Sequence, residues 1–301
     1  MPKSTPILGK ILIGGGTGFI GGNIANALRA IGSDVWIVSR MPGNQHITWS
    51  DINNKTLLDG TQAVINVAGQ NVLDARRKWT EGFKQNVINS RVETTKVLAN
   101  VIKRMKSPPK VYVTISGVGF YKPSLTAEYT EDSESGDDFM ADLCRQWERA
   151  SLLPPELGVR NVIIRSGVVL GQYGGIIKQI YLPFWFGLGG PIASGKQYFP
   201  WIHIEDMINL FMFAIEEDHV TGVLNGVSPQ IITNYEFTKA LGRALWRPTV
   251  IPLPEFVVQK LFGKERAVMM TDGQKVIPKR TLDLGFKYLY SDIDNACKHV
   301  V

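Results

Sequence analysis

The sequence predicts an α/β protein built on a doubly wound parallel sheet, with a smaller C-terminal lobe. Three observations lead to this class. Short runs of β-branched residues alternate with helical stretches through the first 170 residues. A glycine-rich turn joins the first of these runs to the first helical stretch. After about residue 171 the alternation stops, and glycine and aromatic residues become dense.

The individual elements follow from hydrophobic patterning and from helix-ending residues. Strands are expected where Ile, Val and Leu dominate, at residues 11–13, 35–38, 63–67, 111–115 and 162–170. Helices are expected at residues 21–31, 83–106 and about 139–150. Pro108 ends the second helix, because proline cannot continue the helical hydrogen bonding. Further on, Thr233 and Glu236 have the spacing of a capping box and predict a helix start.

The strongest local signal is the segment 11–21, in which a buried strand runs into glycines and then into a helix. Gly15, Gly18 and Gly21 recur at every third position. Such a turn is tight, lets a diphosphate approach the backbone and brings the helix close to the strand. The helix N-terminus offers free N–H groups and the positive end of a dipole. The segment predicts a Rossmann-type dinucleotide site, and the alternative is a glycine turn without a ligand.

The residues at the end of the second strand indicate whether such a site binds NAD(H) or NADP(H). A site for NAD usually has an acidic residue there, which binds the ribose 2′-hydroxyl. This chain has Ser39 and Arg40 instead. Arg40 could bind a 2′-phosphate through its guanidinium, and Ser39 could donate a hydrogen bond to it. The pair predicts NADP(H) over NAD(H), and the alternative is that Arg40 is a solvated loop arginine.

Composition excludes several classes of protein. The 33 basic and 27 acidic residues give a net charge of +6 without any block of like charge, so we expect no nucleic-acid partner. The apolar segment 176–193 is too interrupted to span a membrane, and Met1–Lys10 lacks the apolar core of a signal peptide. Cys144 and Cys297 have neither disulfide nor zinc spacing, and no metal site is expected. We expect an intracellular protein, cytoplasmic or in an organelle such as a mitochondrion or plastid.

The change of pattern near residue 171 divides the chain into two parts. We expect a dinucleotide-binding domain over residues 10–170, with the segment near 201–227 returning to its sheet. The segments 171–200 and 228–301 are expected to form the smaller substrate lobe. The aromatic residues of this lobe could line an apolar substrate cleft or form its core, and the sequence leaves both open.

Several longer motifs occur together in this chain. Three of them lie at residues 15–21 (Gly-Gly-Thr-Gly-Phe-Ile-Gly), 66–69 (Asn-Val-Ala-Gly) and 199–206 (Phe-Pro-Trp-Ile-His-Ile-Glu-Asp). Three more specific ones lie at residues 90–95, 165–171 and 273–280. From about residue 10 to the C-terminus, the chain resembles the epimerase family proteins, which are atypical extended short-chain dehydrogenases/reductases that bind NADP. Bacterial members are described loosely as sugar epimerases or cell-division inhibitors, and plant relatives are linked to plastid division.

The resemblance implies where the cofactor contacts the chain. The implied contacts in the glycine turn are Gly15, Thr17, Gly18, Phe19 and Ile20. The implied contacts elsewhere are Ser39 and Arg40 at the 2′-phosphate, Val67 and Ala68 along a ribose, Arg91 on the long helix, and Val169 near the nicotinamide.

The catalytic pattern of the superfamily is absent at the matching positions. Most members use a serine or threonine together with a Tyr-x-x-x-Lys pair, in which the tyrosine transfers a proton. Here Met140 stands at the tyrosine position, Cys144 at the lysine position and Gly117 at the serine position. Ser116 and Tyr121 remain the candidate catalytic residues, and the alternative for Tyr121 is a packing aromatic.

Two functions from different classes follow. The first is an NADP(H)-dependent oxidoreductase or epimerase-like enzyme with an unknown small-molecule substrate, which the complete cofactor turn and the substrate lobe favour. The second is a non-catalytic protein that senses NADP(H) and acts through a partner, which the missing acid and base favour. Fold analogy favours the enzyme. A homodimer is also expected, because relatives in the superfamily are often dimers.

Overall fold

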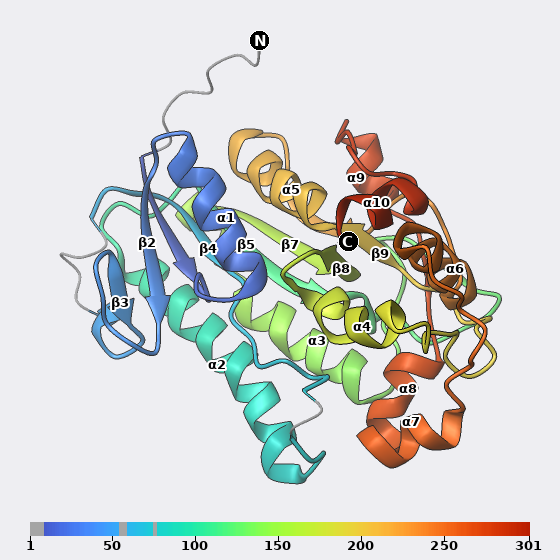
Figure 1. The fold of residues 1–301 in the computed structure, drawn as a ribbon. Helices are drawn as coiled ribbons and strands as arrows, with labels where there is room; N and C mark the ends of the chain where they lie inside the picture. Colours follow the sequence, from blue (N-terminus) through green and yellow to red (C-terminus); the bar gives the residue numbers. More distant parts are fainter. Residues whose placement is uncertain (1–8, 54–58, 75–76) are drawn as a thin grey trace.

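The central feature of the computed structural model is one parallel sheet, which has seven strands within the described residues (Figure 1). The structure describes residues 9–53, 59–74 and 77–301, so most of Met1–Lys10, where we expect no signal peptide, lies outside it. The strand order is β10-β7-β5-β4-β1-β2-β3. These strands are β1 (Lys10–Gly14), β2 (Asp34–Ser39), β3 (His46–Thr48), β4 (Thr61–Asn66), β5 (Val111–Gly117), β7 (Arg160–Ser166) and β10 (Gly222–Gly226).

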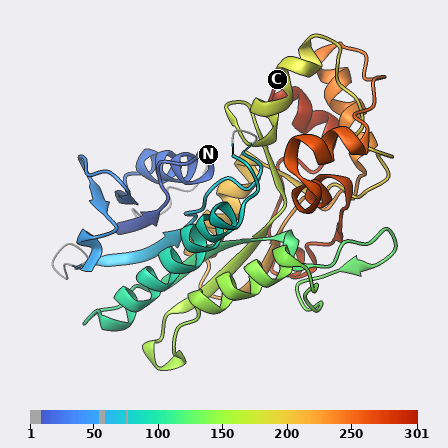
Figure 2. The same ribbon diagram turned by 90° about the horizontal axis from the view of Figure 1, so that it is seen from below.

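Helices cover both faces of this sheet, which confirms the predicted α/β class. Helices α1 (Phe19–Ala30) and α5 (Ile204–Glu216) contact each other on one face. Helices α2 (Glu81–Arg104) and α3 (Phe139–Ser151) contact each other on the opposite face, and Figure 2 shows them lying along the same side of the sheet. The strands between these layers are buried on both sides, which is why they read as continuous apolar runs.

Local capping sets the helix ends, and several of them differ from the expected ones. The first helix begins at Phe19 rather than at residue 21, because the extended Gly18 already serves as its N-cap. The long helix begins two residues earlier than expected, where the Thr80 hydroxyl accepts a hydrogen bond from the Phe83 N–H (3.2 Å). It also ends earlier, because Met105 has extended backbone angles.

The expected single strand over residues 162–170 is wrong, because the chain divides it into β7 and β8 (Val168–Gly171) at Gly167. A Cβ on Gly167 would lie 2.6 Å from the carbonyl oxygen of Pro200, so the two backbones lie in close contact there. Strand β8 leaves the main sheet and pairs in parallel with β9 (Trp201–His203). The chain then passes through α5 to β10, which pairs with β7 in the main sheet.

The remaining elements belong to the C-terminal lobe and its edge. They are α4 (Gly175–Trp185), α6 (Asn234–Leu245), α7 (Glu255–Phe262), α8 (Lys264–Thr271), α9 (Lys279–Asp283), α10 (Ile293–His299) and the paired strands β6 (Glu128–Tyr129) and β11 (Lys275–Val276). The predicted capping box is confirmed at the start of α6.

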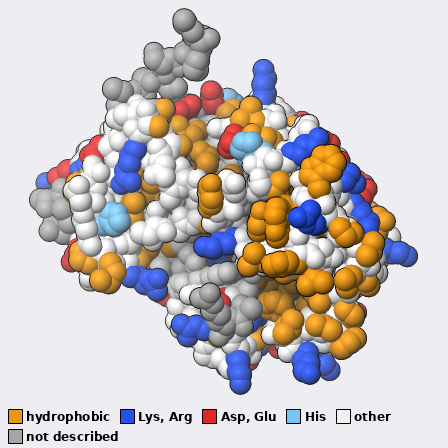
Figure 3. Space-filling view, viewed as in Figure 1, with side chains coloured by type: hydrophobic (Ala, Val, Ile, Leu, Met, Phe, Trp, Pro, Cys, Tyr) orange, Lys and Arg blue, Asp and Glu red, His pale blue; other side chains and the backbone are white. Residues whose placement is uncertain are grey.

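The aromatic residues of the lobe divide between its core and its surface. Phe199 stacks on Phe237, with ring centroids 4.3 Å apart, and Trp201 is fully buried. Trp185 and Phe186 lie at the surface instead. Figure 3 shows apolar side chains gathered over this lobe. Among the described residues, no helix combines the length and apolar character needed to cross a membrane.

A buried ion pair fixes α3 against β7. The Arg165 guanidinium donates two hydrogen bonds to the Glu148 carboxylate, at 2.8 and 2.9 Å. The two side chains are only 5% and 11% exposed. A third hydrogen bond of 2.9 Å joins Arg165 to the Tyr121 hydroxyl. Since water is excluded, each charge depends on its partner.

We expect Glu148→Gln to lower the free energy of unfolding by about 3–5 kcal/mol, because it leaves the buried Arg165 charge uncompensated. Urea denaturation followed by circular dichroism measures the difference. The control is Glu93→Gln, which breaks an exposed pair with Lys96 and should cost less than about 1 kcal/mol. Equal losses in the two variants would contradict the role of burial.

Candidate functional site

The glycine turn lies against the end of β4, and this contact explains its glycines. Gly15 has a φ of +80°, a conformation that favours glycine, and a Cβ there would lie 2.7 Å from the Ala68 backbone. A Cβ on Gly21 would lie 2.4 Å from the Gly15 carbonyl oxygen. The turn therefore lies in contact with Val67 and Ala68, which are also predicted to bind the cofactor.

The N-terminus of α1 opens into a cleft. Its N-cap, Gly18, supplies no side-chain hydrogen bond, and its first turn contains no acidic residue. The cleft has a volume of about 670 Å³. It is lined by the N-terminal half of α1 and the preceding turn, by the segment 71–74, and by the start of α4 with its preceding loop. Free N–H groups at a helix N-terminus suit an anion.

Two buried polar residues, which the sequence analysis did not identify as site residues, hold β4 in place beside the turn. The Asn66 side-chain amide accepts a hydrogen bond from the Ala68 N–H (3.2 Å) and donates one to Thr95 (2.8 Å). The Trp147 indole also donates to Thr95, at 3.0 Å. The network joins β4, α2 and α3. Asn66 belongs to the motif at 66–69 and Thr95 to the motif at 90–95, and these motifs were the available signals.

Ser39 and Arg40 lie on the other side of the turn. The N–H of Gly15 donates to the Val38 carbonyl at 3.1 Å, so the end of β2 directly adjoins the turn. Ser39 is buried and donates from its hydroxyl to the Met41 carbonyl (2.6 Å). Arg40 is exposed, and among the described residues no carboxylate pairs with it. Its guanidinium is therefore available for a phosphate.

Arg91 projects from α2 towards the motif at 66–69. A Cβ on Gly69 would lie 3.1 Å from the Arg91 Cζ, and this Cζ lies 5.2 Å from the centroid of the Trp147 ring. Burial lowers the pKa of Arg91 to about 10, which leaves it charged at neutral pH. Within the described residues it pairs with no carboxylate, so the structure holds a half-buried cation beside the cleft.

Phe19 and Val169 connect the turn to the C-terminal lobe. The Phe19 ring packs on the loop after β8, where a Cβ on Gly174 would lie 2.1 Å from it. Val169 is buried in β8, and its carbonyl faces the start of α4. Ile20, by contrast, turns inward and packs against the core of the main sheet.

The positions that the motifs match to the superfamily's catalytic residues meet at the end of β5. Gly117 and Gly119 adjoin the side chains of Cys144 and Met140, respectively. The Cys144 thiol is buried and donates to the Gly117 carbonyl at 3.6 Å. Burial raises the pKa of this thiol to about 11, so it is neither a cation nor a reactive thiolate at neutral pH. Among these residues, none transfers a proton.

The two candidate catalytic residues differ in their surroundings. Ser116 is buried on β5, and its hydroxyl has no hydrogen-bond partner among the described residues. The Tyr121 hydroxyl donates to Asn225 (2.8 Å) and accepts from Arg165. Burial raises the pKa of Tyr121. These contacts favour a packing role for Tyr121, because its hydroxyl is already committed inside the protein.

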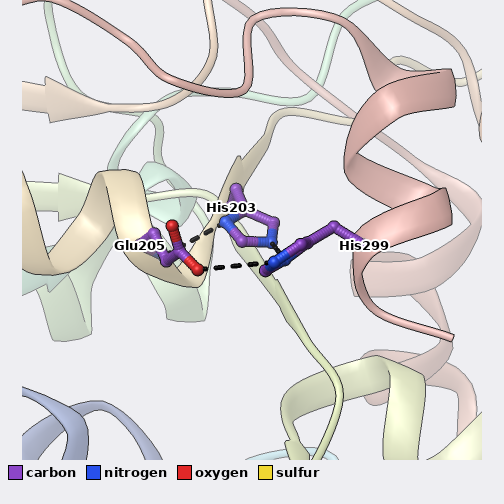
Figure 4. A group of neighbouring side chains, drawn as sticks. All are labelled: His203, Glu205 and His299. Atoms are coloured by element: carbon purple, nitrogen blue, oxygen red, sulfur yellow. Dashed lines mark hydrogen bonds and ion pairs between the residues drawn. The ribbon is translucent and has the colours of Figure 1, made fainter.

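A second cluster, away from the cleft, contains His203, Glu205 and His299 (Figure 4). The Nε2 of His203 lies 3.1 Å from the Nδ1 of His299, and the Nδ1 of His203 accepts the Glu205 N–H (3.2 Å). A metal-bound histidine normally donates from its other ring nitrogen. Since this nitrogen already accepts a hydrogen bond, the geometry favours a clamp between α5 and α10 over a metal site.

This cluster predicts a pH dependence of stability. Burial, assisted by His299, lowers the pKa of His203 from its usual 6.5 to about 4. Between these two pH values, His203 therefore stays neutral in the folded protein but is protonated in the unfolded chain. Stability should be unaffected by His203 above pH 6.5 and should fall by about 2–3 kcal/mol as the pH drops towards 4. Denaturation curves of wild type and His203→Gln across this range should diverge on acidification, and parallel curves would contradict the assignment.

Comparisons with known proteins place this geometry in a family. The family model described as "NAD dependent epimerase/dehydratase family" matches residues 11–139, and a domain of unknown function, DUF1731, matches residues 253–300. The chain is 50% identical to the human epimerase family protein SDR39U1 over 293 residues, which are 97% of this chain and 99% of that protein. It is 32% identical to YfhF of Bacillus subtilis, with 97% and 98% of the two chains covered.

Solved structures agree with these matches. The crystal structure of human SDR39U1 with NADPH superimposes with a TM-score of 0.94 at 49% identity, covering 97% of this chain and 98% of that one. A UDP-N-acetylglucosamine 4-epimerase from Bacillus cereus, only 17% identical, has a TM-score of 0.73 over 97% of both chains and shares the fold. The resemblance inferred from the motifs is thus confirmed, and the chain belongs to the epimerase family proteins, with an NAD(P)-binding fold of the short-chain dehydrogenase type.

Proposed function

We propose that this protein binds NADP(H) in the cleft at the carboxyl edge of the sheet and acts as an oxidoreductase or epimerase-like enzyme on a small-molecule substrate. The observation that carries the proposal is the uncapped N-terminus of α1, which faces a cleft of about 670 Å³. A dinucleotide diphosphate would satisfy the free N–H groups there. The NADPH bound to human SDR39U1 supports the same choice of cofactor.

Of the predicted cofactor contacts, Thr17, Gly18 and Phe19 line the cleft itself, and the others lie near the glycine turn or the strand ends. The N–H groups of Gly15 and Gly18 are bonded within the protein, so the diphosphate would be bound by N–H groups of the first turn of α1, such as those of Phe19 and Ile20, with Gly15, Thr17 and Gly18 close to it. Ser39 and the exposed Arg40 would hold the 2′-phosphate, while Val67 and Ala68 would lie along a ribose. Arg91 would add a positive charge, and Val169 would lie near the nicotinamide.

The chemistry of the site is set by positioning. Bound NADPH supplies a hydride to an electrophilic carbon. Met140 and Cys144 donate no proton at neutral pH, so in this proposal the proton comes from water that reaches the cleft. Ser116 is a second possible donor at the end of β5. The chain's own task is to orient the reactants and to place the Arg91 charge beside them.

A second candidate function, sensing of NADP(H) without catalysis, is supported by the side chains at the end of β5. The Met140 and Cys144 positions hold no acid or base, and the Tyr121 hydroxyl is committed to buried partners. These features would suit a protein that senses NADP(H) without catalysis and acts through a partner. The cleft would then bind the cofactor, and the adjoining lobe would present a surface that depends on it.

Partners and compartment remain predictions. We expect no nucleic-acid or membrane partner, and homodimerisation is expected only by analogy with the superfamily. We propose a cytoplasmic or organellar location. A relative from Arabidopsis thaliana, 32% identical, is named as chloroplastic.

Arg40→Ala should weaken NADPH binding roughly ten- to a hundredfold and leave NADH binding nearly unchanged, because it removes a charge-assisted bond to the 2′-phosphate. Fluorescence titration of both cofactors against wild type and variant measures this. The matched control is Arg29→Ala, since Arg29 lies in the last turn of α1, away from the N-terminus that faces the cleft. No preference for NADPH in wild type would overturn the choice of NADP(H).

Protein loaded with NADPH and mixed with a small-molecule cell extract should lose the absorbance of the reduced nicotinamide. Gly18→Asp provides the control, because a carboxylate at the helix N-terminus repels the diphosphate. If the absorbance falls with wild type but not with Gly18→Asp, the protein is a reductase. A stable absorbance at stoichiometric protein, despite tight NADPH binding, would favour the sensing role.

A further inference from the structure

The C-terminal segment 253–300 matches a domain of unknown function, and one of its helices touches the wall of the cofactor cleft. That wall includes Leu73 and Asp74. We name the described residues Asn71–Asp74 and Arg77–Thr80 the cleft loop. It leads directly into α2, and α8 packs against it.

Arg266 of α8 holds the cleft loop at two points. Its guanidinium donates to the backbone carbonyls of Asp74 (2.8 Å) and Arg77 (2.5 Å). The side chain is only 1% exposed. Backbone carbonyls rather than a carboxylate accept these two bonds, so the cation would lose its acceptors if the loop moved away. A buried cation without acceptors is costly, and Arg266 therefore favours one position of the loop.

Aromatic rings surround this contact and extend it to the helix at the site. The Arg266 Cζ lies 5.2 Å from the centroid of the Trp79 ring and 5.6 Å from that of Phe262. The Trp79 ring meets Phe139 edge to face, with centroids 5.6 Å apart. Phe139 is the first residue of α3 and precedes Met140, so the contact connects α8, the cleft loop and the site.

The neighbouring Glu265 adds polar bonds on the outer side. Its carboxylate accepts a hydrogen bond from the Trp79 indole (2.9 Å) and pairs with Lys84 of α2 (2.6 Å). Two consecutive residues of α8 therefore bind the cleft loop, the buried Arg266 and the exposed Glu265.

We propose that α8 is a latch that holds the cleft loop in place and thereby sets the affinity of the cleft for NADP(H), a role that rests on the proposed function. Arg266 is a positioning residue in this account, because it acts on the cofactor only through the loop. The C-terminal segment then contributes to cofactor binding from outside the dinucleotide-binding domain.

The test compares Arg266→Met with wild type. Arg266→Lys is the conservative variant, and Lys264→Gln, an exposed change on the same helix, is the control. NADPH affinity is measured by fluorescence titration, at a temperature where circular dichroism shows every variant folded. Trypsin cleavage after Arg77 and Lys78 is followed by mass spectrometry, with and without saturating NADPH.

We expect Arg266→Met to bind NADPH at least about tenfold more weakly and to be cleaved faster at Arg77 and Lys78. Saturating NADPH should slow cleavage in wild type. Arg266→Lys should lie between the two, since one ammonium reaches the carbonyls less well than a planar fork, and Lys264→Gln should match wild type. If Arg266→Met does not fold, Glu265→Gln at the exposed half of the latch should still weaken NADPH binding several-fold.

Two outcomes overturn the inference, and they are distinguishable. Unchanged NADPH affinity in folded Arg266→Met, with normal binding by wild type, would reduce α8 to ordinary packing and leave the proposed function intact. Failure of wild type to bind NADPH at all would overturn the proposed function and this inference together.

Discussion

The close approach of the glycine turn to the end of β4 is the constraint on which the rest of the site depends. No side chain fits between Gly15 and Ala68, where a Cβ would lie 2.7 Å from the backbone. Asn66 and Thr95 then fix that backbone from behind through buried hydrogen bonds. This arrangement leaves the N-terminus of α1 without a side-chain cap. An anion bound there would accept hydrogen bonds from its backbone N–H groups and stabilise the helix.

The proposed site combines the binding features of a dinucleotide enzyme with an unusual set of side chains at the end of β5. There, a buried thiol and a thioether stand at the positions that the sequence motifs match to a lysine and a tyrosine. Their apolar surroundings stabilise neutral groups, and burial raises the pKa of Cys144 further. Arg91, which pairs with no carboxylate among the described residues, comes from a different helix, α2. In the proposed function, the chemistry therefore depends on positioning and on this charge, with the proton supplied by water or by Ser116.

The C-terminal lobe is coupled to the cleft at separate places. Phe19 packs on the loop after β8, which leads into α4. Arg266 and Glu265 of α8 form hydrogen bonds with Asp74 and Trp79 of the cleft loop. Away from the cleft, the His203 and His299 pair fixes the last helix of the lobe to the start of α5. Because these contacts come from segments far apart in the chain, movement of the lobe would change the shape of the cleft.

The sequence by itself determined most of the sheet, the turn and the family, because these depend on local patterns, but it did not indicate the short edge strand β3. Alternating apolar runs predicted the strands, and the spacing of Gly15, Gly18 and Gly21 predicted a tight turn. Only the tertiary structure decided the break at Gly167, because there the chain leaves β7 and meets the backbone of Pro200, which is distant in the sequence. The same is true of Thr95, Tyr121 and Arg266. Their roles depend on partners 29 to 192 residues away, and no local spacing encodes such contacts.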